Sequence, residues 1–207
     1  MGLVGTLPTK FRSGTIGQEP GRDGPPPGGG GPLMPTGQLF VWFLIVGITM
    51  FFAALVSAAI VRIGIDGRSL ALPGIVWGNT VSLLLSSAAL GVAQLHMHRR
   101  SGVDETAMRF LWVALCLGLV FVGGQIVAWV ELVQRGIFLP SFPAASFFYI
   151  LTAAHGLHLL GGILALLGLV GVRRRSLLFR RRLAPVAMYW HFLTLIWLAL
   201  LWVLQSR

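Results

Sequence analysis

Histidine side chains lie deep inside the last two long apolar stretches of this sequence. His155 and His158 are three residues apart and therefore share one face of a helix, and His191 lies in the final stretch. Two imidazoles at this spacing can share a metal ion, and histidines from two helices can bind a haem axially. Polar groups are costly in hydrocarbon, so each of these residues is a candidate functional residue.

Three interpretations of these histidines stay open. A closed metal site needs more ligands than three histidines supply, and no carboxylate lies in the middle of an apolar stretch. A haem would need only two axial histidines. In the third interpretation the imidazoles are neutral and form hydrogen bonds between helices or to a bound lipid, as Thr152 and Thr194 nearby also could.

Polar residues elsewhere form no recognisable catalytic constellation. Asn79 lies near the start of the second apolar stretch, where an interhelical hydrogen bond is the expected role. Gln125 lies deeper in the third stretch, and Glu131 follows Trp129 at the end of that stretch, shallow enough to meet water or a lipid headgroup. No glycine-rich phosphate loop is present between a strand and a helix. We therefore expect no catalytic centre and no metal site in this chain.

The composition places the chain in a membrane. Hydrophobic residues make up 56% of the sequence and charged residues 11%, a balance that soluble globular domains do not have. The net charge of +10 comes from arginine clusters between apolar stretches, which argues against a basic face for nucleic acid. Cys116 is the single cysteine, so an intrachain disulfide is impossible.

Five uncharged stretches are long enough to cross about 30 Å of hydrocarbon as helices. Pro140 and Pro143 are expected to delay the fourth helix to about Ala145. The fold class is therefore all-α, an integral membrane bundle of five transmembrane helices without the internal repeat typical of secondary transporters. The expected spans are residues 38–61, 73–95, 110–130, 145–172 and 183–204.

Arginine counts predict the orientation of the helices, because cytoplasmic loops carry the excess of positive charge. The loops after the second and fourth spans are arginine-rich, whereas the opposite side has few arginines. We expect the N-terminus in the cytoplasm and the C-terminus outside. Residues 1–36, rich in glycine and proline, are expected to be a disordered cytoplasmic tail and not a cleaved signal peptide.

Two dense motifs resemble a known family. The stretch from Ser146 to Gly162, SFFYILTAAHGLHLLGG, is similar to the signature helix of cytochrome c oxidase subunit III, and YWHFLTLIW, from Tyr189 to Trp197, is similar to its last helix. Shorter matches follow the family's order along all five spans. These are TMFFAAL at 49–55, WGNT at 77–80 and GQIVAW at 124–129.

The resemblance implies a subunit without haem or copper that sits beside the catalytic subunit of a bacterial haem–copper oxidase. Its expected partners are subunit I as the main contact, subunit II and other respiratory subunits, which would carry the haem and copper. It further implies bound phospholipid, support of proton uptake, and a location in the cytoplasmic (inner) membrane. The residues expected to be structural or to line the lipid cleft are Asn79, Gln125, Trp129, Glu131, Tyr149, Thr152, His155, His158, Tyr189, Trp190 and His191.

Two positions depart from the family's pattern. Ile48 and Thr194 occupy places where many members carry a glutamate and an aspartate. The subclass stays open, since quinol oxidases and the accessory subunit of nitric oxide reductases share this fold. An independent membrane haem protein, using His191 with His155 or His158, is the alternative from another class.

Overall fold

The computed structural model describes residues 36–99, 105–171 and 176–206 of the chain. Within them the backbone forms five α-helices and no strand. The expected disordered tail at residues 1–36 lies outside the described residues except for Thr36, as do the arginines at positions 173–175. The helices are α1 (Thr36–Asp66), α2 (Ile75–Arg99), α3 (Glu105–Gln134), α4 (Pro143–Gly171) and α5 (Ser176–Gln205).

All five helices are long and apolar enough to span a membrane, which confirms the predicted fold class. Most of their ends extend beyond the expected spans, whereas α2 begins two residues later than expected and α4 ends one residue earlier. Helix α4 begins at Pro143 and not at Ala145, because proline fits the first position of a helix, where its missing N–H is not needed. Helix α5 begins seven residues before the expected Leu183, at Ser176.

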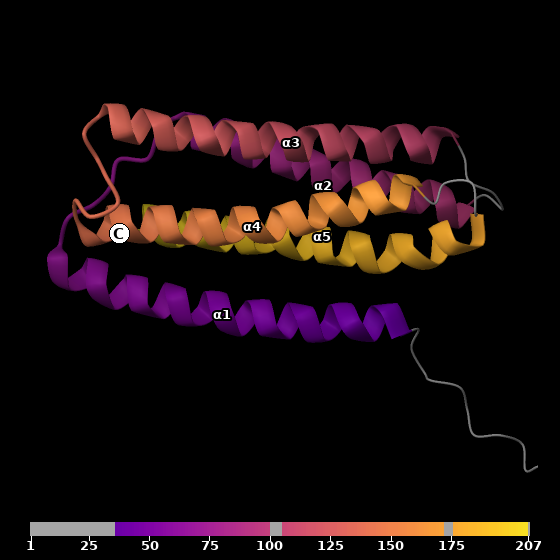
Figure 1. The fold of residues 1–207 in the computed structure, drawn as a ribbon, viewed down its shortest axis with the longest axis horizontal. Coiled ribbons are helices and arrows are strands. Elements are labelled where there is room, and N and C mark those ends of the chain that lie inside the picture. The colour runs from indigo at the N-terminus through magenta and orange to yellow at the C-terminus, as the bar shows by residue number, and fades with distance from the viewer. Residues whose placement is uncertain (1–35, 100–104, 172–175, 207) are drawn as a thin grey trace, which may run out of the picture. The chain divides into compact units, whose positions relative to one another are not determined.

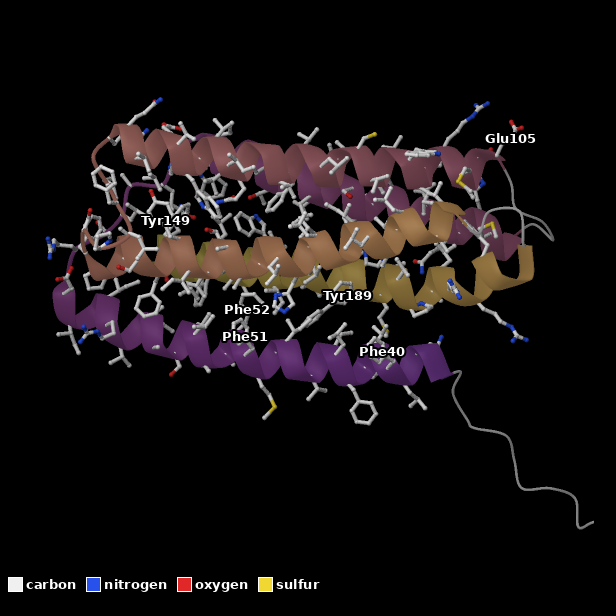
Figure 2. The ribbon with its side chains drawn as sticks, viewed as in Figure 1. Phe40, Phe51, Phe52, Glu105, Tyr149 and Tyr189 are labelled. Atoms are coloured by element: carbon white, nitrogen blue, oxygen red, sulfur yellow. The ribbon has the colours of Figure 1, made fainter. Side chains whose placement is uncertain are left out.

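The helices of the described chain contact one another in the ring order α1, α5, α2, α3, α4, and α4 and α5 also touch across the ring. Sequence neighbours run antiparallel, so α1, α3 and α5 begin at one end of the bundle (Figure 1). Phe40 of α1 and Glu105 of α3 lie toward that end, whereas Tyr149 of α4 lies toward the other (Figure 2). Helices α1 and α2 flank α5, and their backbones stay more than 8 Å apart, Cα to Cα, in the described residues.

Packing is tightest between α2 and α3 and loosest around α1. Two hydroxyls of α2 donate to backbone carbonyls of α3, Ser82 to Leu117 at 2.9 Å and Ser86 to Ala114 at 2.7 Å. Small residues four apart allow this close approach of two backbones in a membrane. Of an apolar 18-residue stretch in each helix, only 17% is buried in α1, compared with 50% in α5. Helix α1 is therefore the peripheral element.

Candidate functional site

Trp190 lies at the centre of the bundle and joins four helices. Its indole is fully buried, and Gly118 of α3 and Gly162 of α4 face its ring so closely that a Cβ would come within 2.8 Å and 3.0 Å of it. The indole Nε1 donates to the Ser86 hydroxyl at 3.1 Å, and that hydroxyl in turn donates to the Ala114 carbonyl. One side chain of α5 is thus held by α2, α3 and α4.

A second tryptophan of α5 repeats this arrangement one level further along the helix. Trp197 Nε1 donates to the Thr80 hydroxyl at 3.0 Å, and Thr80 donates to the carbonyl of Val76 in its own helix. The Trp197 ring also packs edge-on against Phe121 of α3, with centroids 4.8 Å apart. The interhelical hydrogen bond expected in this part of α2 is therefore made by Thr80.

His155 is enclosed by aromatic rings. It is fully buried, and its ring centroid lies 5.2 Å from Trp197, 5.8 Å from Phe121 and 6.5 Å from Phe52. Neither ring nitrogen has a hydrogen-bond partner among the described residues, which differs from the expected interhelical bond. His155 fills a slot between α1, α3, α4 and α5 as a packed core side chain.

His158 shares Phe52 as a neighbour with His155 but also packs near Phe51. Its Nδ1 lies 2.8 Å from the carbonyl of Ala154 in the same helix, and its ring packs near Phe51 and Phe52 of α1. The backbone carbonyl of His158 accepts a hydrogen bond from the Tyr189 hydroxyl at 3.0 Å. Phe52 and Tyr189 lie between α1 and the α4–α5 pair (Figure 2). This contact layer attaches α1 to the rest of the bundle.

His191 lies on the opposite side of α5 from this layer and bonds to α2. Its Nδ1 is 2.5 Å from the Ser87 hydroxyl, so this is the histidine that makes the expected interhelical hydrogen bond. His155 and His158 therefore both pack against Phe52 of α1, whereas His191 bonds to α2. Among the described residues, no group of three or more histidine, cysteine or acidic side chains lies close enough to hold a metal ion.

Four further expected site residues lie toward the end of the bundle where α3 ends. Trp129 Nε1 donates to the Thr152 hydroxyl at 3.0 Å and so joins α3 to α4. The Tyr149 hydroxyl donates to the Ile137 carbonyl at 2.9 Å and fastens the loop between these helices. Glu131 forms an exposed ion pair with Arg135 one turn further along α3. These contacts fix the loop and the helix ends.

Asn79 and Gln125 have unpartnered buried amide atoms. The Nδ2 of Asn79 and both amide atoms of Gln125 have no hydrogen-bond partner among the described residues. The Asn79 amide lies directly against Gly124, where a Cβ would come within 1.9 Å of its Oδ1. The glycine therefore makes room for the amide, and α2 and α3 approach each other at this point.

Three of the grooves on the surface of the bundle are lined by described residues. The first, of about 450 Å³, lies between α1, α4 and α5 and has Arg182 at one end. The second, of about 270 Å³, lies between α3 and α4 and includes Gln125 and Thr152. The third, of about 470 Å³, lies over α5 between α1 and α2 and includes His191. The walls of all three are mainly apolar, which suits the acyl chains of lipids or the transmembrane helices of other proteins rather than a polar substrate.

The spacing of small residues predicts close helix packing but not which serines and glycines receive the large side chains of α5. Trp190 was an expected structural residue, yet its partners Ser86, Gly118 and Gly162 are recognisable only as small residues in apolar stretches. The spacing of Ser82 and Ser86 by four residues was the available signal, because it places both on one helix face. The resulting arrangement joins helices and offers no nucleophile or acid–base pair.

Comparison with known proteins identifies the family of this chain. Residues 38–205 match the family model described as cytochrome c oxidase subunit III. The match includes all five membrane-spanning helices, and the chain belongs to the cytochrome c oxidase subunit III family.

Curated relatives of two kinds are similar to the chain. Cytochrome c oxidase subunit 3 of Thermostichus vulcanus is 32% identical over 127 residues, 59% of this chain and 60% of that protein. Cytochrome bo(3) ubiquinol oxidase subunit 3 of Pseudomonas aeruginosa is 35% identical over 123 residues, 58% of this chain and 57% of that protein. The probable quinol oxidase subunit 3 of Staphylococcus aureus is 34% identical over 121 residues, 57% of this chain and 59% of that protein. In each case the match spans less than two thirds of the relative's length.

Proposed function

We propose that this chain is the non-catalytic third subunit of a bacterial haem–copper terminal oxidase in the cytoplasmic membrane. The observation that carries the proposal is the family match over residues 38–205. The packing supports it, because Trp190, Trp197 and His191 use their polar atoms to join helices. In this proposal haem and copper belong to partner subunits, chiefly subunit I, and the chain stabilises the catalytic subunit.

The groove between α1, α4 and α5 supports phospholipid binding. Its floor is made of Gly161, Ala165 and Gly168 of α4, and Phe40 of α1 forms part of one wall. Arg182 lies at the end from which α5 enters the membrane, where a headgroup phosphate would be. An acyl chain would fill the space between α1 and the bundle, and lipid held there would support proton uptake in the neighbouring subunit by keeping that region packed.

The test is extraction of the natural complex in mild detergent, followed by absorption spectroscopy, metal analysis and identification of its subunits. The chain is expected to co-purify with a larger haem-bearing subunit, and the separated chain is expected to show no Soret band and no stoichiometric metal. Recovery as a stable homo-oligomer without haem or a redox partner would contradict the proposal. A Soret band from the separated chain would favour the haem-protein alternative.

The electron donor has two candidates. Relatives named cytochrome c oxidase subunit 3 and quinol oxidase subunit 3 match this chain at similar identity. Purified complex supplied with reduced cytochrome c or with a quinol, with oxygen uptake as the readout, distinguishes them. The donor that supports oxygen uptake defines the oxidase subclass.

A further inference from the structure

A continuous face of α5 is left uncovered by the other helices of the described chain. Its residues follow one another at alternating intervals of four and three, the spacing with which one helix packs along another at a small crossing angle. All of these side chains are half-buried or exposed, with Leu195 at 64% and Trp202 at 71% exposure. We call this face the α5 seam, and it consists of Ala184, Met188, His191, Leu195, Leu198 and Trp202.

The seam has side walls over its first half. Trp42 of α1 and Gln94 of α2 flank it, and together with α5 they enclose the third groove, of about 470 Å³. This groove exists because α1 and α2 both pack on α5 while their backbones stay more than 8 Å apart, Cα to Cα, in the described residues. The first half of the α5 seam therefore lies in a groove between α1 and α2.

His191 contributes a polar atom, Nε2, to the α5 seam. Its Nδ1 is occupied by the Ser87 hydroxyl, and no hydrogen bond to Nε2 is found among the described residues. In either tautomer Nε2 is a donor or an acceptor, and leaving it bare in hydrocarbon costs free energy. Whatever covers the seam should therefore bring a hydrogen-bonding group to this depth.

We propose that the α5 seam is the docking site of a transmembrane helix from a partner subunit, which presents a hydroxyl or amide side chain to His191 Nε2. This inference rests on the proposed function for the existence of a partner and adds the surface that the partner uses. A hydroxyl or an amide can donate or accept, so it suits either tautomer of the imidazole.

Length and depth favour a helix over lipid. From Ala184 to Trp202 the seam rises about 27 Å, close to the full thickness of the hydrocarbon, whereas one acyl chain reaches only through its own leaflet. His191 lies nine residues beyond Arg182, about 13 Å further along the helix. Ester and phosphate groups of a lipid stay near the surface, so they do not reach Nε2.

Photo-crosslinking in native membranes tests the docking surface. Benzoylphenylalanine replaces Leu195 on the seam or, as a control, Leu164 of α4, which is exposed to nearly the same extent at 68%. The Leu195 variant is expected to form an adduct with another transmembrane subunit, and the Leu164 variant to lose that adduct. Adducts of Leu195 with lipid alone, with a quinone, or with a second copy of this chain would overturn the proposal.

Co-purification and cross-linking together distinguish a failure of the proposed function from a failure of the seam assignment. If no haem-bearing partner co-purifies with the unmodified chain, the proposed function fails. If the partner co-purifies and cross-links from Leu164 but not from Leu195, only the seam assignment fails.

A pair of substitutions tests the polar contact. In His191→Asn the short amide can reach Ser87 but not the position of Nε2, whereas the longer amide of His191→Gln can reach the position of Nε2. The asparagine variant is expected to weaken retention of the partner by about tenfold in detergent titration, and the glutamine variant to retain it. If both variants retain the partner equally well, or both lose it equally, the assignment of Nε2 to the partner would be overturned. Unfolding of the separated chains shows that both variants are folded.

Discussion

At the scale of single residues, the bundle is held together by side chains with polar groups that pack against glycines. Trp190 fits between Gly118 and Gly162, and the Asn79 amide fits against Gly124. Such pairs replace the hydrophobic effect, which cannot drive one helix toward another in lipid. Of two neighbouring glycines in α3, only Gly124 has a side chain packed against it, whereas Gly123 has none. The two positions should therefore tolerate a methyl group differently.

Gly124→Ala is expected to destabilise the chain by about 1–3 kcal/mol, because the new methyl would overlap the buried Asn79 amide. Gly123→Ala is the matched control, since nothing lies within 4 Å of a Cβ at that position. It is expected to be neutral or slightly stabilising, as alanine favours the helix. Unfolding in mixed micelles with increasing SDS measures both.

The double variant Gly124→Ala with Asn79→Ala provides the second half of this test. Removal of the amide should restore most of the stability lost at position 124, because the overlapping atoms are gone. Equal stability losses for Gly123→Ala and Gly124→Ala would show that the close approach of α2 and α3 is not real.

Trp190→Phe is expected to cost about 2 kcal/mol, because it removes the hydrogen bond to Ser86 and leaves part of the slot between α3 and α4 empty. Trp202→Phe, at an exposed indole, is expected to change the stability of the separated chain by less than about 0.5 kcal/mol. The same SDS titration, followed by near-ultraviolet circular dichroism, measures the difference. Similar losses at both positions would contradict the central role of Trp190.

The sequence could identify the polar residues but not their partners. Trp190 and Ser86 are 104 positions apart, and nothing local to either residue predicts that they meet. His155 shows the opposite failure, because a buried histidine suggests a hydrogen bond, whereas its surroundings are Phe52, Phe121 and Trp197. Partner choice depends on which helices adjoin, and that is set by the whole bundle.

At the scale of helices, α1 differs from the others because it is attached by few side chains. Ile48 and Phe52 are buried, whereas Met50 and Phe51, on the same turn, are exposed. Ile48 also occupies the position where the resemblance described above implies a glutamate in many members. The buried face of α1 in this region is thus wholly apolar.

Ile48→Ala is expected to leave oxidase turnover nearly unchanged while lowering stability by about 2–4 kcal/mol through loss of packing. The control is Met50→Ala, whose side chain is 70% exposed. Turnover is measured in assembled complex and stability in the separated chain.

Hydrophobic carbodiimides are also expected not to label the membrane core of this chain, because the acids of the described helices, Asp66, Glu105 and Glu131, lie near helix ends.

Two outcomes would contradict this prediction. One is efficient carbodiimide labelling of an acid within a span. The other is a large loss of turnover in Ile48→Ala when assembly is intact.

The number and type of helices could be predicted from length and composition, because about 20 apolar residues in a row have few alternatives to a membrane span. The starts of α4 and α5 could not be predicted equally well. Pro143 was expected to delay α4, although proline at the first helical position requires no rearrangement. Helix α5 begins before its apolar stretch, where charged residues such as Arg181 gave no signal for a helix.

At the scale of the whole molecule, the described helices place the loops after α1 and α3 at one end of the bundle and the start of α3 at the other (Figure 1). Arginine counts predict that the first end faces outward and the second faces the cytoplasm. This orientation follows from sequence alone and calls for a direct experiment.

Single cysteines at Ser69 and Ser141 are expected to react with a membrane-impermeant maleimide in intact spheroplasts, whereas a cysteine at Glu105 is expected to react only after permeabilisation. All three positions are exposed. Cys116, which faces outward from the bundle, is first replaced by serine so that it contributes no signal. The reverse labelling pattern would show that the chain inserts with the opposite polarity.

The loose attachment of α1 has a consequence for biosynthesis. This helix is strongly apolar and makes few contacts, so it can leave the translocon and rest in the bilayer before any later helix exists. Helix α2 carries Asn79, Ser82 and Ser86, and the two serine hydroxyls bond to backbone carbonyls of α3. Helices α2 and α3 therefore suit insertion as a pair, and α5, which follows them in the chain, then adds Trp190 to the contact with Ser86.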